Sequence, residues 1–143
     1  MVVQLNPGSR GIAHAAITIN ASRERVWQAL VDPATIGRWM PALDIRSDWR
    51  PGAPITWTAD LLGRRHDVKG EVVRADAEAT LEYRYTNPLN RVDHVVSIEL
   101  ADDGPGTHVA VTEQGSRNDI ELAHAEGGWK LMLANMKFVV EGA

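Results

Sequence analysis

Hydrophobic and polar residues alternate along several short stretches of the chain, and this period of two predicts β-strands. In the first stretch, residues 14–20, the apolar residues Ala15, Ile17 and Ile19 fall on one side. Further strands are expected between about residues 45 and 115, in the stretches 44–49, 55–61, 66–76, 80–86, 94–100 and 108–114. Strands with one apolar and one polar face are typical of an antiparallel sheet that is covered on one side only.

Other segments follow the helical period. Ser22 is a good N-cap for a helix over residues 22–32. A second short turn over residues 33–39 begins with a proline and is ended by the next one, Pro41. The longest helical pattern runs from about residue 118 to 140, where apolar residues recur at intervals of three and four: Leu122, Ala125, Trp129, Met132, Met136 and Val139.

The order of elements is therefore a strand, a broken helical segment, about six strands and a long helix. The simplest packing wraps one curved antiparallel sheet, of about six to seven strands, around the long C-terminal helix, which is an α+β fold. Gly127 and Gly128 interrupt the helical pattern. Because glycine costs about 1 kcal/mol relative to alanine inside a helix, we expect this pair to weaken or bend the helix and to let a strand or a ligand come close.

The composition is that of one globular domain. The chain has 143 residues, of which 44% are hydrophobic and 24% charged, and this length is close to that of a single domain. We place the domain at residues 11–143 and a flexible tail at residues 1–10. The start of the chain lacks the basic and apolar regions of a signal peptide, and no run of about 18 apolar residues predicts a membrane span. We therefore expect a cytoplasmic protein.

Composition also excludes several kinds of site. The chain has no cysteine, which rules out thiolate nucleophiles, disulfides and cysteine-based metal sites. The net charge is −4 and the best basic run is residues 64–66, a pattern that disfavours nucleic-acid binding. Glu121 and His124 have helical spacing, but one such pair is typical of a helix surface rather than of a metal site. Neither a metal nor a cofactor is expected.

Two short motifs near the ends of the domain carry a family resemblance. The first is V-W-x-A-L-x-D-P with a later tryptophan, formed by Val26, Trp27, Ala29, Leu30, Asp32, Pro33 and Trp39. The second is a Gly-Trp pair followed by apolar residues, formed by Gly128, Trp129, Leu131, Met132, Leu133 and Met136. Over about residues 12–140 the chain resembles the START-like, helix-grip (SRPBCC) superfamily, and within it the branch named for the activator of the heat-shock-protein-90 ATPase.

The resemblance implies a deep cavity between the sheet and the long helix, which in many relatives holds a lipid, a sterol or a polyketide. We therefore expect a hydrophobic small molecule as the partner. Its expected contacts come from the inward rows of the strands and from the helices: Trp39, Trp57, His66, Tyr83, Tyr85, His94, Val96, Val111, Glu113, Trp129, Met132, Leu133 and Met136. Buried Tyr and His groups need polar partners, and methionine is common where a surface adapts to a ligand.

Several alternatives stay open from the sequence. A solid core without a cavity is the alternative at each single position. Some relatives catalyse cyclisation, dehydration or hydrolysis, so His66, His94 or Glu113 could act as an acid or base. A carboxylate at the end of a strand, as at Glu113, is ordinarily exposed to solvent. The branch name suggests a chaperone-regulating interaction module instead, and a homodimer is left open.

Overall fold

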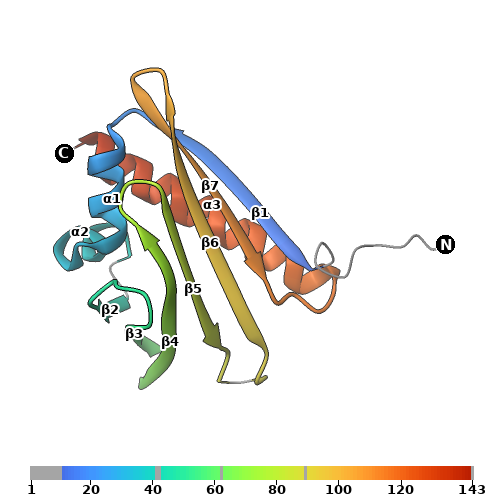
Figure 1. Ribbon diagram of the computed structural model, residues 1–143. Coiled ribbons are helices and arrows are strands. Elements are labelled where there is room, and N and C mark those ends of the chain that lie inside the picture. The colour runs from blue at the N-terminus through green and yellow to red at the C-terminus, as the bar shows by residue number, and fades with distance from the viewer. Residues whose placement is uncertain (1–10, 41–42, 62, 89, 143) are drawn as a thin grey trace.

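In the computed structural model, a seven-stranded antiparallel sheet curves around a long helix (Figure 1). The structure describes residues 11–40, 43–61, 63–88 and 90–142. The predicted tail over residues 1–10, and Pro41 as the end of the second helix, lie outside the described residues.

The elements follow one another in the predicted order. The first three are β1 (Ile12–Ile19), α1 (Arg23–Val31) and α2 (Pro33–Trp39). Six strands follow: β2 (Leu43–Ser47), β3 (Pro54–Leu61), β4 (Arg64–Asp76), β5 (Thr80–Thr86), β6 (Asp93–Asp103) and β7 (Gly106–Gln114). The chain then forms the long helix α3 (Asp119–Gly142). The strand order is β1-β7-β6-β5-β4-β3-β2, so β1 and β2 are the two edges of the sheet.

The predicted α+β fold is confirmed, including the two short helices after the first strand. The hydroxyl of Ser22 accepts a hydrogen bond from the backbone N–H of Arg25 (3.2 Å), as expected of an N-cap. Asp32 caps α2 in the same way, because its Oδ2 accepts from the backbone N–H of Thr35 (3.1 Å). No helix among the described residues is long and apolar enough to cross a membrane.

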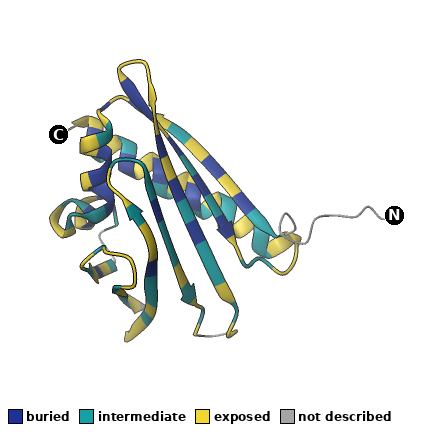
Figure 2. Ribbon diagram, in the orientation of Figure 1, coloured by how far each residue is buried: buried dark blue, intermediate teal, exposed yellow. Residues whose placement is uncertain are grey.

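The core lies between the concave face of the sheet and the helices. Buried and more exposed residues alternate along β1, β6 and β7 (Figure 2), which is the predicted period of two. The long helix contributes a stripe at the helical spacing: Trp129, Leu133, Met136 and Val140. Burying one large apolar side chain contributes about 1.5–3 kcal/mol, so this face fixes α3 against the sheet.

Polar contacts also hold α3 along the edge strand β1. Glu126 Oε2 accepts a hydrogen bond from the backbone N–H of His14 (3.0 Å), and Glu141 Oε2 accepts from that of Asn20 (2.7 Å). The ammonium group of Lys137 donates to the backbone carbonyl of Thr18 (2.8 Å). These side chains occupy backbone groups that a sheet edge otherwise leaves unpaired. They therefore fix how α3 lies along the sheet.

The expectation that a strand comes close at Gly127 and Gly128 was wrong. The helix α3 continues through both residues, and a Cβ atom at either position would meet nothing within 4 Å. Neither a strand nor another element comes close there. The helix tolerates two poor helix formers because the stripe that includes Trp129 and Leu133 packs on the core, and packing contributes more to helix stability than propensity does.

Candidate functional site

A cavity of about 270 Å³ lies between the sheet and the helical layer. It is lined by residues from the end of α2, from five strands and from α3: Met40, Leu43, Trp57, Val68, Tyr83, Tyr85, Glu113, Trp129 and Met132. Its lining is mainly aromatic and apolar, and it contains a single carboxylate. Apolar walls with a few placed polar groups are typical of small-molecule sites.

Strand register brings the aromatic residues of the cavity together. Trp57 of β3 lies opposite Val68 of β4, while Tyr85 of β5 lies opposite Gly70 on one side and His94 on the other. The ring of Trp57 is 5.4 Å from that of Tyr83 and 5.6 Å from that of Tyr85, measured between centroids. Such tilted and edge-on pairs stabilise the rings beyond the area they bury. These contacts hold the rings of the aromatic wall against one another.

Gly70 makes room for the ring of Trp57. A Cβ atom at this position would lie 2.8 Å from the ring and 2.3 Å from the backbone carbonyl oxygen of Arg84. Both distances are shorter than normal contacts, so the site needs a residue without a side chain. The glycine thus sets where one wall of the cavity stands.

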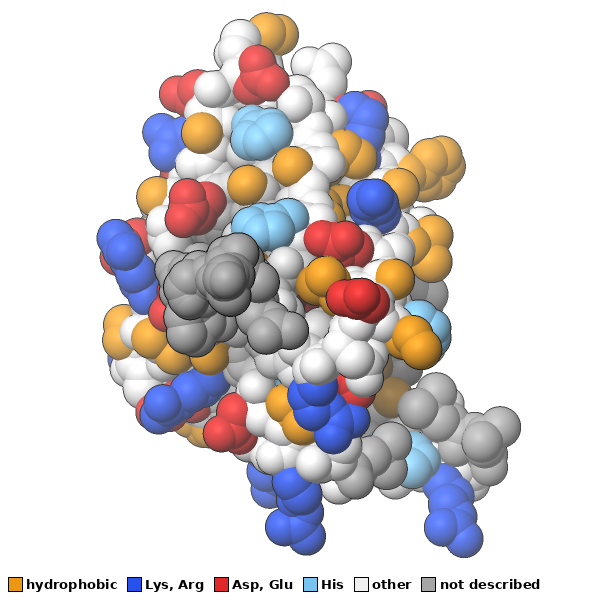
Figure 3. Space-filling view, turned by 90° about the vertical axis from the view of Figure 1, so that its right-hand side faces the viewer, with side chains coloured by type: hydrophobic (Ala, Val, Ile, Leu, Met, Phe, Trp, Pro, Cys, Tyr) orange, Lys and Arg blue, Asp and Glu red, His pale blue; other side chains and the backbone are white. Residues whose placement is uncertain are grey.

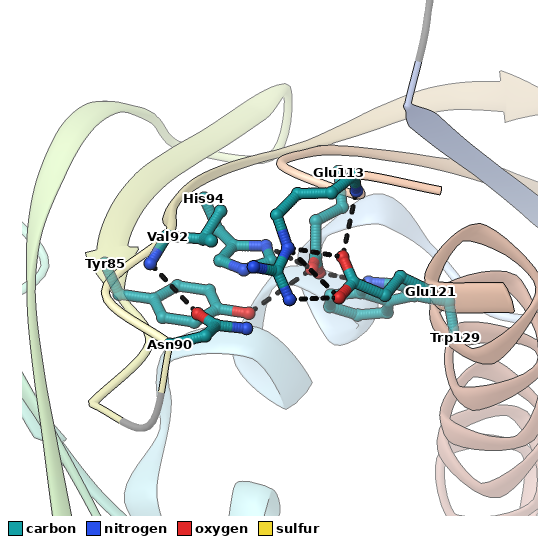
Figure 4. Close-up of polar contacts among 8 residues, drawn as sticks. Tyr85, Asn90, Val92, His94, Glu113, Glu121 and Trp129 are labelled. Atoms are coloured by element: carbon teal, nitrogen blue, oxygen red, sulfur yellow. Dashed lines mark hydrogen bonds and ion pairs between the residues drawn. The ribbon is translucent and has the colours of Figure 1, made fainter. Parts of the chain in front are cut away.

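Glu113 is the centre of a buried polar cluster. Figure 4 shows Tyr85, His94 and Trp129 converging on its carboxylate. The indole N–H of Trp129 donates to Oε1 (2.8 Å), and the hydroxyl of Tyr85 donates to Oε2 (3.3 Å). Nδ1 of His94 lies 3.0 Å from the same Oε2. The expectation that a strand-end carboxylate is exposed was wrong. Glu113 is only 8% exposed, because its side chain lies on the covered face of the sheet, where Trp129 of α3 and Tyr85 contact its carboxylate.

His94 is held from three directions. Its ring stacks on that of Tyr85, with centroids 4.9 Å apart and planes 7° apart. Gly115, at a φ of +130°, lies so close that a Cβ atom there would be 2.6 Å from Nδ1. The other ring nitrogen, Nε2, is buried and has no hydrogen-bond partner among the residues that the structure describes. The imidazole is therefore fixed in place, with one nitrogen bound to Glu113 and the other unsatisfied.

The two tyrosines of the cavity stay protonated at neutral pH. Burial raises the pKa of Tyr83 well above its usual value, followed by the repulsion that an ionised Tyr85 and Glu113 would exert on an ionised Tyr83. Burial and the neighbouring Glu113 likewise raise the pKa of Tyr85. Both hydroxyls are thus available as hydrogen-bond donors. Tyr85 donates to Glu113, whereas the hydroxyl of Tyr83 has no hydrogen-bond partner among the described residues.

A second, more polar hollow of about 360 Å³ is lined by His94, Glu121 and His124, among other residues. Glu113 lines both this hollow and the first cavity. The sequence pairs Glu121 with His124, but Glu121 instead binds the guanidinium of Arg117 (2.5 Å), whose hydrogen bonds lower the pKa of that carboxyl to about 2. Within the described ranges, no group of three or more His, Asp and Glu side chains could hold a metal ion.

The fold and both sequence motifs can be compared with known proteins. A family model described as "Activator of Hsp90 ATPase homolog 1-like protein" matches residues 20–141. The chain belongs to this family. Comparison with the curated proteins gives no match.

Solved structures agree with membership of the Hsp90 ATPase activator homolog 1-like family. ChR145 from Cytophaga hutchinsonii is 31% identical with a TM-score of 0.81, over 92% of this chain and 94% of that one. The Aha1 dimer from Colwellia psychrerythraea is 20% identical with a TM-score of 0.73, over 91% and 96%. CalU16 from Micromonospora echinospora is 21% identical with a TM-score of 0.71, over 89% and 74%. The last two show the fold alone.

In this family member, the predicted contact residues divide into groups. Those that line the cavity are Trp57, Tyr83, Tyr85, Glu113, Trp129 and Met132. His94 reaches this group through Glu113. Those buried in the core away from the described cavity wall are Trp39, Val96, Val111, Leu133 and Met136. Trp39 links α2 to α1, since its indole N–H donates a hydrogen bond to the backbone carbonyl of Ala29 (2.8 Å).

His66 lies apart from both groups. His66 and Val68 are two residues apart on β4 and so belong to the same face of the strand. His66 is nevertheless exposed, as are all of residues 64–67 at the start of β4. This end of the strand extends beyond the core, so its inward phase does not bury it. The structure therefore does not bring His66 near His94 or Glu113.

Three cavity residues were not among the predicted contacts: Met40, Leu43 and Val68. Val68 could have been found, because it shares the phase of Gly70 and Val72 on β4. Met40 and Leu43 lie around the turn between α2 and β2, where the backbone N–H of Leu43 donates to the carbonyl of Met40 (3.1 Å). Neither of the two periodic patterns covers such a turn, so the sequence carried no signal for it.

Proposed function

We propose that this protein binds a small organic molecule with an aromatic or apolar body in the cavity between sheet and helices. The observation that carries the proposal is the roughly 270 Å³ cavity, lined by Trp57, Tyr83, Tyr85, Trp129 and Met132 around one buried carboxylate. The fold of the family supports it, because the concave sheet and α3 meet without filling the space between them.

The volume favours a ligand of one or two rings. A dry cavity of about 150 Å³ accommodates benzene, whereas drug-sized ligands occupy about 300–1,000 Å³. Long lipids and sterols exceed the space that the described side chains leave. The hydroxyl of Tyr83 can donate a hydrogen bond to one polar substituent of the ligand. Such a bond favours binding, because it satisfies a donor that has no partner among the described residues.

A panel of one- and two-ring compounds, neutral and charged, tests the proposal. Binding should quench tryptophan fluorescence and raise the melting temperature. When free ligand reaches a hundred times its Kd, the free energy of unfolding should rise by about 2.7 kcal/mol. The substitution Met132→Trp fills the cavity and should abolish both signals while the protein stays folded. Lys130→Trp is the matched control, because Lys130 is exposed on the same helix, and it should bind normally. Undiminished binding by Met132→Trp, or no binding of any compound to the wild type, would refute the proposal.

Acid–base catalysis is the second candidate, favoured by the 3.0 Å contact between His94 and Glu113. Two titratable groups within hydrogen-bond reach are what such chemistry needs. However, His94 is not among the described residues that line the cavity. Among those residues, only Glu113 lines both the cavity and the second, more polar hollow. A ligand in the cavity would therefore exchange protons with Glu113 first. Binding without turnover is the simpler function for this geometry.

We also propose that the chain forms a homodimer through the outer face of α3. Ile120, Leu131 and Phe138 recur there at whole-turn spacing and are 74%, 65% and 82% exposed. Gly127 on the same face has nothing near it, so a side chain of a second copy can approach the backbone. The Aha1 structure from Colwellia psychrerythraea, which shares the fold, is a dimer.

Sedimentation velocity decides the assembly state. The wild type should sediment as a dimer at micromolar concentration, and Phe138→Glu should shift it to a monomer because a charge would be buried in the contact. Lys69→Glu, which reverses an exposed charge on β4, should leave the dimer intact. A monomeric wild type at high concentration contradicts the homodimer.

A further inference from the structure

The described walls of the cavity contain one acidic side chain and no basic one. Its described lining contains one carboxylate, Glu113, and no Lys, Arg or His. The indole N–H of Trp129 and the hydroxyl of Tyr85 donate to this carboxylate, and Nδ1 of His94 lies 3.0 Å from it. Oε1 accepts only one of these hydrogen bonds and keeps capacity for another partner on the ligand.

His94 lies outside this lining. Its Nδ1 is 3.0 Å from Oε2 of Glu113, but His94 is not among the described residues that line the cavity. Its other ring nitrogen, Nε2, is buried and has no hydrogen-bond partner among the described residues. Glu113 is thus the acidic group that a ligand in the cavity would meet.

The other walls are also favourable to a cation. Trp57, Tyr83, Tyr85 and Trp129 come from β3, β5 and α3 and supply four π-systems around a small volume. The faces of such rings carry partial negative charge and attract an alkylated ammonium group within about 6 Å of the ring centroid. The field of Glu113 reaches across the cavity, since its charge contributes to the raised pKa of both Tyr83 and Tyr85.

We propose that the ligand of this cavity is a small organic cation, in which an alkylated ammonium group on an aromatic or aliphatic body lies among these four rings beside Glu113. This inference rests on the proposed function and narrows its ligand class. An alkylated ammonium is suited to the site because it is large, weakly hydrated and able to contact the rings without donating hydrogen bonds that the apolar walls could not accept.

Two probes of nearly the same shape isolate the charge. Phenyltrimethylammonium and tert-butylbenzene differ by one positive charge, and both are small enough for the cavity. Isothermal calorimetry or ligand-observed NMR with the wild-type protein should show the cation binding about tenfold or more tightly. Equal binding, or a preference for tert-butylbenzene, overturns the cation inference but leaves the proposed function standing. Binding of neither probe overturns the cation inference, and the proposed function falls with it only when no compound of the wider panel binds.

Variants show whether Glu113 causes the preference. Glu113→Gln keeps the size of the side chain and an acceptor for Trp129 but removes the charge, so the preference for phenyltrimethylammonium should fall about tenfold. Glu99→Gln removes an exposed carboxylate on the outer face of β6 and should leave the preference unchanged. An unchanged preference in Glu113→Gln overturns the role given to this residue. If Glu113→Gln does not fold, Trp57→Leu takes its place and should reduce the preference by removing one ring.

Discussion

Replacing Glu113 by alanine is expected to destabilise the protein by about 3 kcal/mol or more. The carboxylate satisfies the indole N–H of Trp129, the hydroxyl of Tyr85 and Nδ1 of His94. Removing it leaves these donors without their acceptor in a mainly buried site, and each buried unsatisfied group costs about 1–3 kcal/mol. Water that enters the new space recovers only part of this loss. Urea unfolding followed by circular dichroism measures the change as a lower midpoint at constant slope.

Two other substitutions separate hydrogen bonding from charge. Glu113→Gln keeps one acceptor and most of the volume, so its loss of stability should be about half that of the alanine variant. Glu121→Ala removes the ion pair with Arg117, a solvent-exposed contact that contributes little to stability. If Glu113→Ala unfolds at the same urea concentration as Glu121→Ala, the cluster does not stabilise the fold as argued.

Gly70→Ala is expected to lower stability by about 2–3 kcal/mol, the cost of overpacking a filled site. The added methyl group would lie 2.3 Å from the carbonyl oxygen of Arg84 and 2.8 Å from the ring of Trp57. The carbonyl belongs to the adjacent strand β5 and cannot rotate away, so the two strands must separate or the ring must move. Because Trp57 lines the cavity, ligand affinity should fall together with stability. Thermal unfolding and ligand titration of the same variant measure both.

Gly128→Ala is the matched control for this substitution. A Cβ atom there meets nothing within 4 Å, and the residue lies inside the helix α3. Alanine should therefore stabilise the protein by about 0.5–1 kcal/mol through helix propensity alone. Opposite signs for the two glycine-to-alanine changes would show that local space, not residue type, decides the effect. A Gly70→Ala protein as stable as the wild type would mean that strands β4 and β5 yield more easily than the close contact implies.

Most of the fold could be predicted because it depends on local rules. The period of two between residues 80 and 86 identifies β5 at its observed bounds, and Pro33 and Trp39 enclose α2 as expected. Caps such as Ser22 act within one turn and are visible in the sequence. Strand boundaries elsewhere were less accurate, as at β6, which continues to Asp103, because pairing with β7 extends the ladder into a polar stretch.

The candidate site was predictable only in part. Alternation placed Tyr83, Tyr85 and Glu113 on the inward face, since neighbouring side chains on a strand point to opposite sides. The same rule placed His66 inward, but the first residues of β4 extend beyond the core and are exposed. Period alone cannot tell where along a strand the covering helix ends. For the same reason it did not separate the cavity wall from solid core at Val96 and Leu133.

By itself, the sequence determined which elements form and which of their faces are apolar, because both follow from spacing along one segment. Only the tertiary structure decided that Tyr85, His94 and Trp129 meet at Glu113, since that meeting depends on strand register and on how α3 lies along β1. Only packing decided that Gly70 lies against Trp57 while Gly127 and Gly128 face open space. The cavity between sheet and helix depends on how well the side chains of the two facing surfaces fit together. The sequence of one segment does not determine that fit.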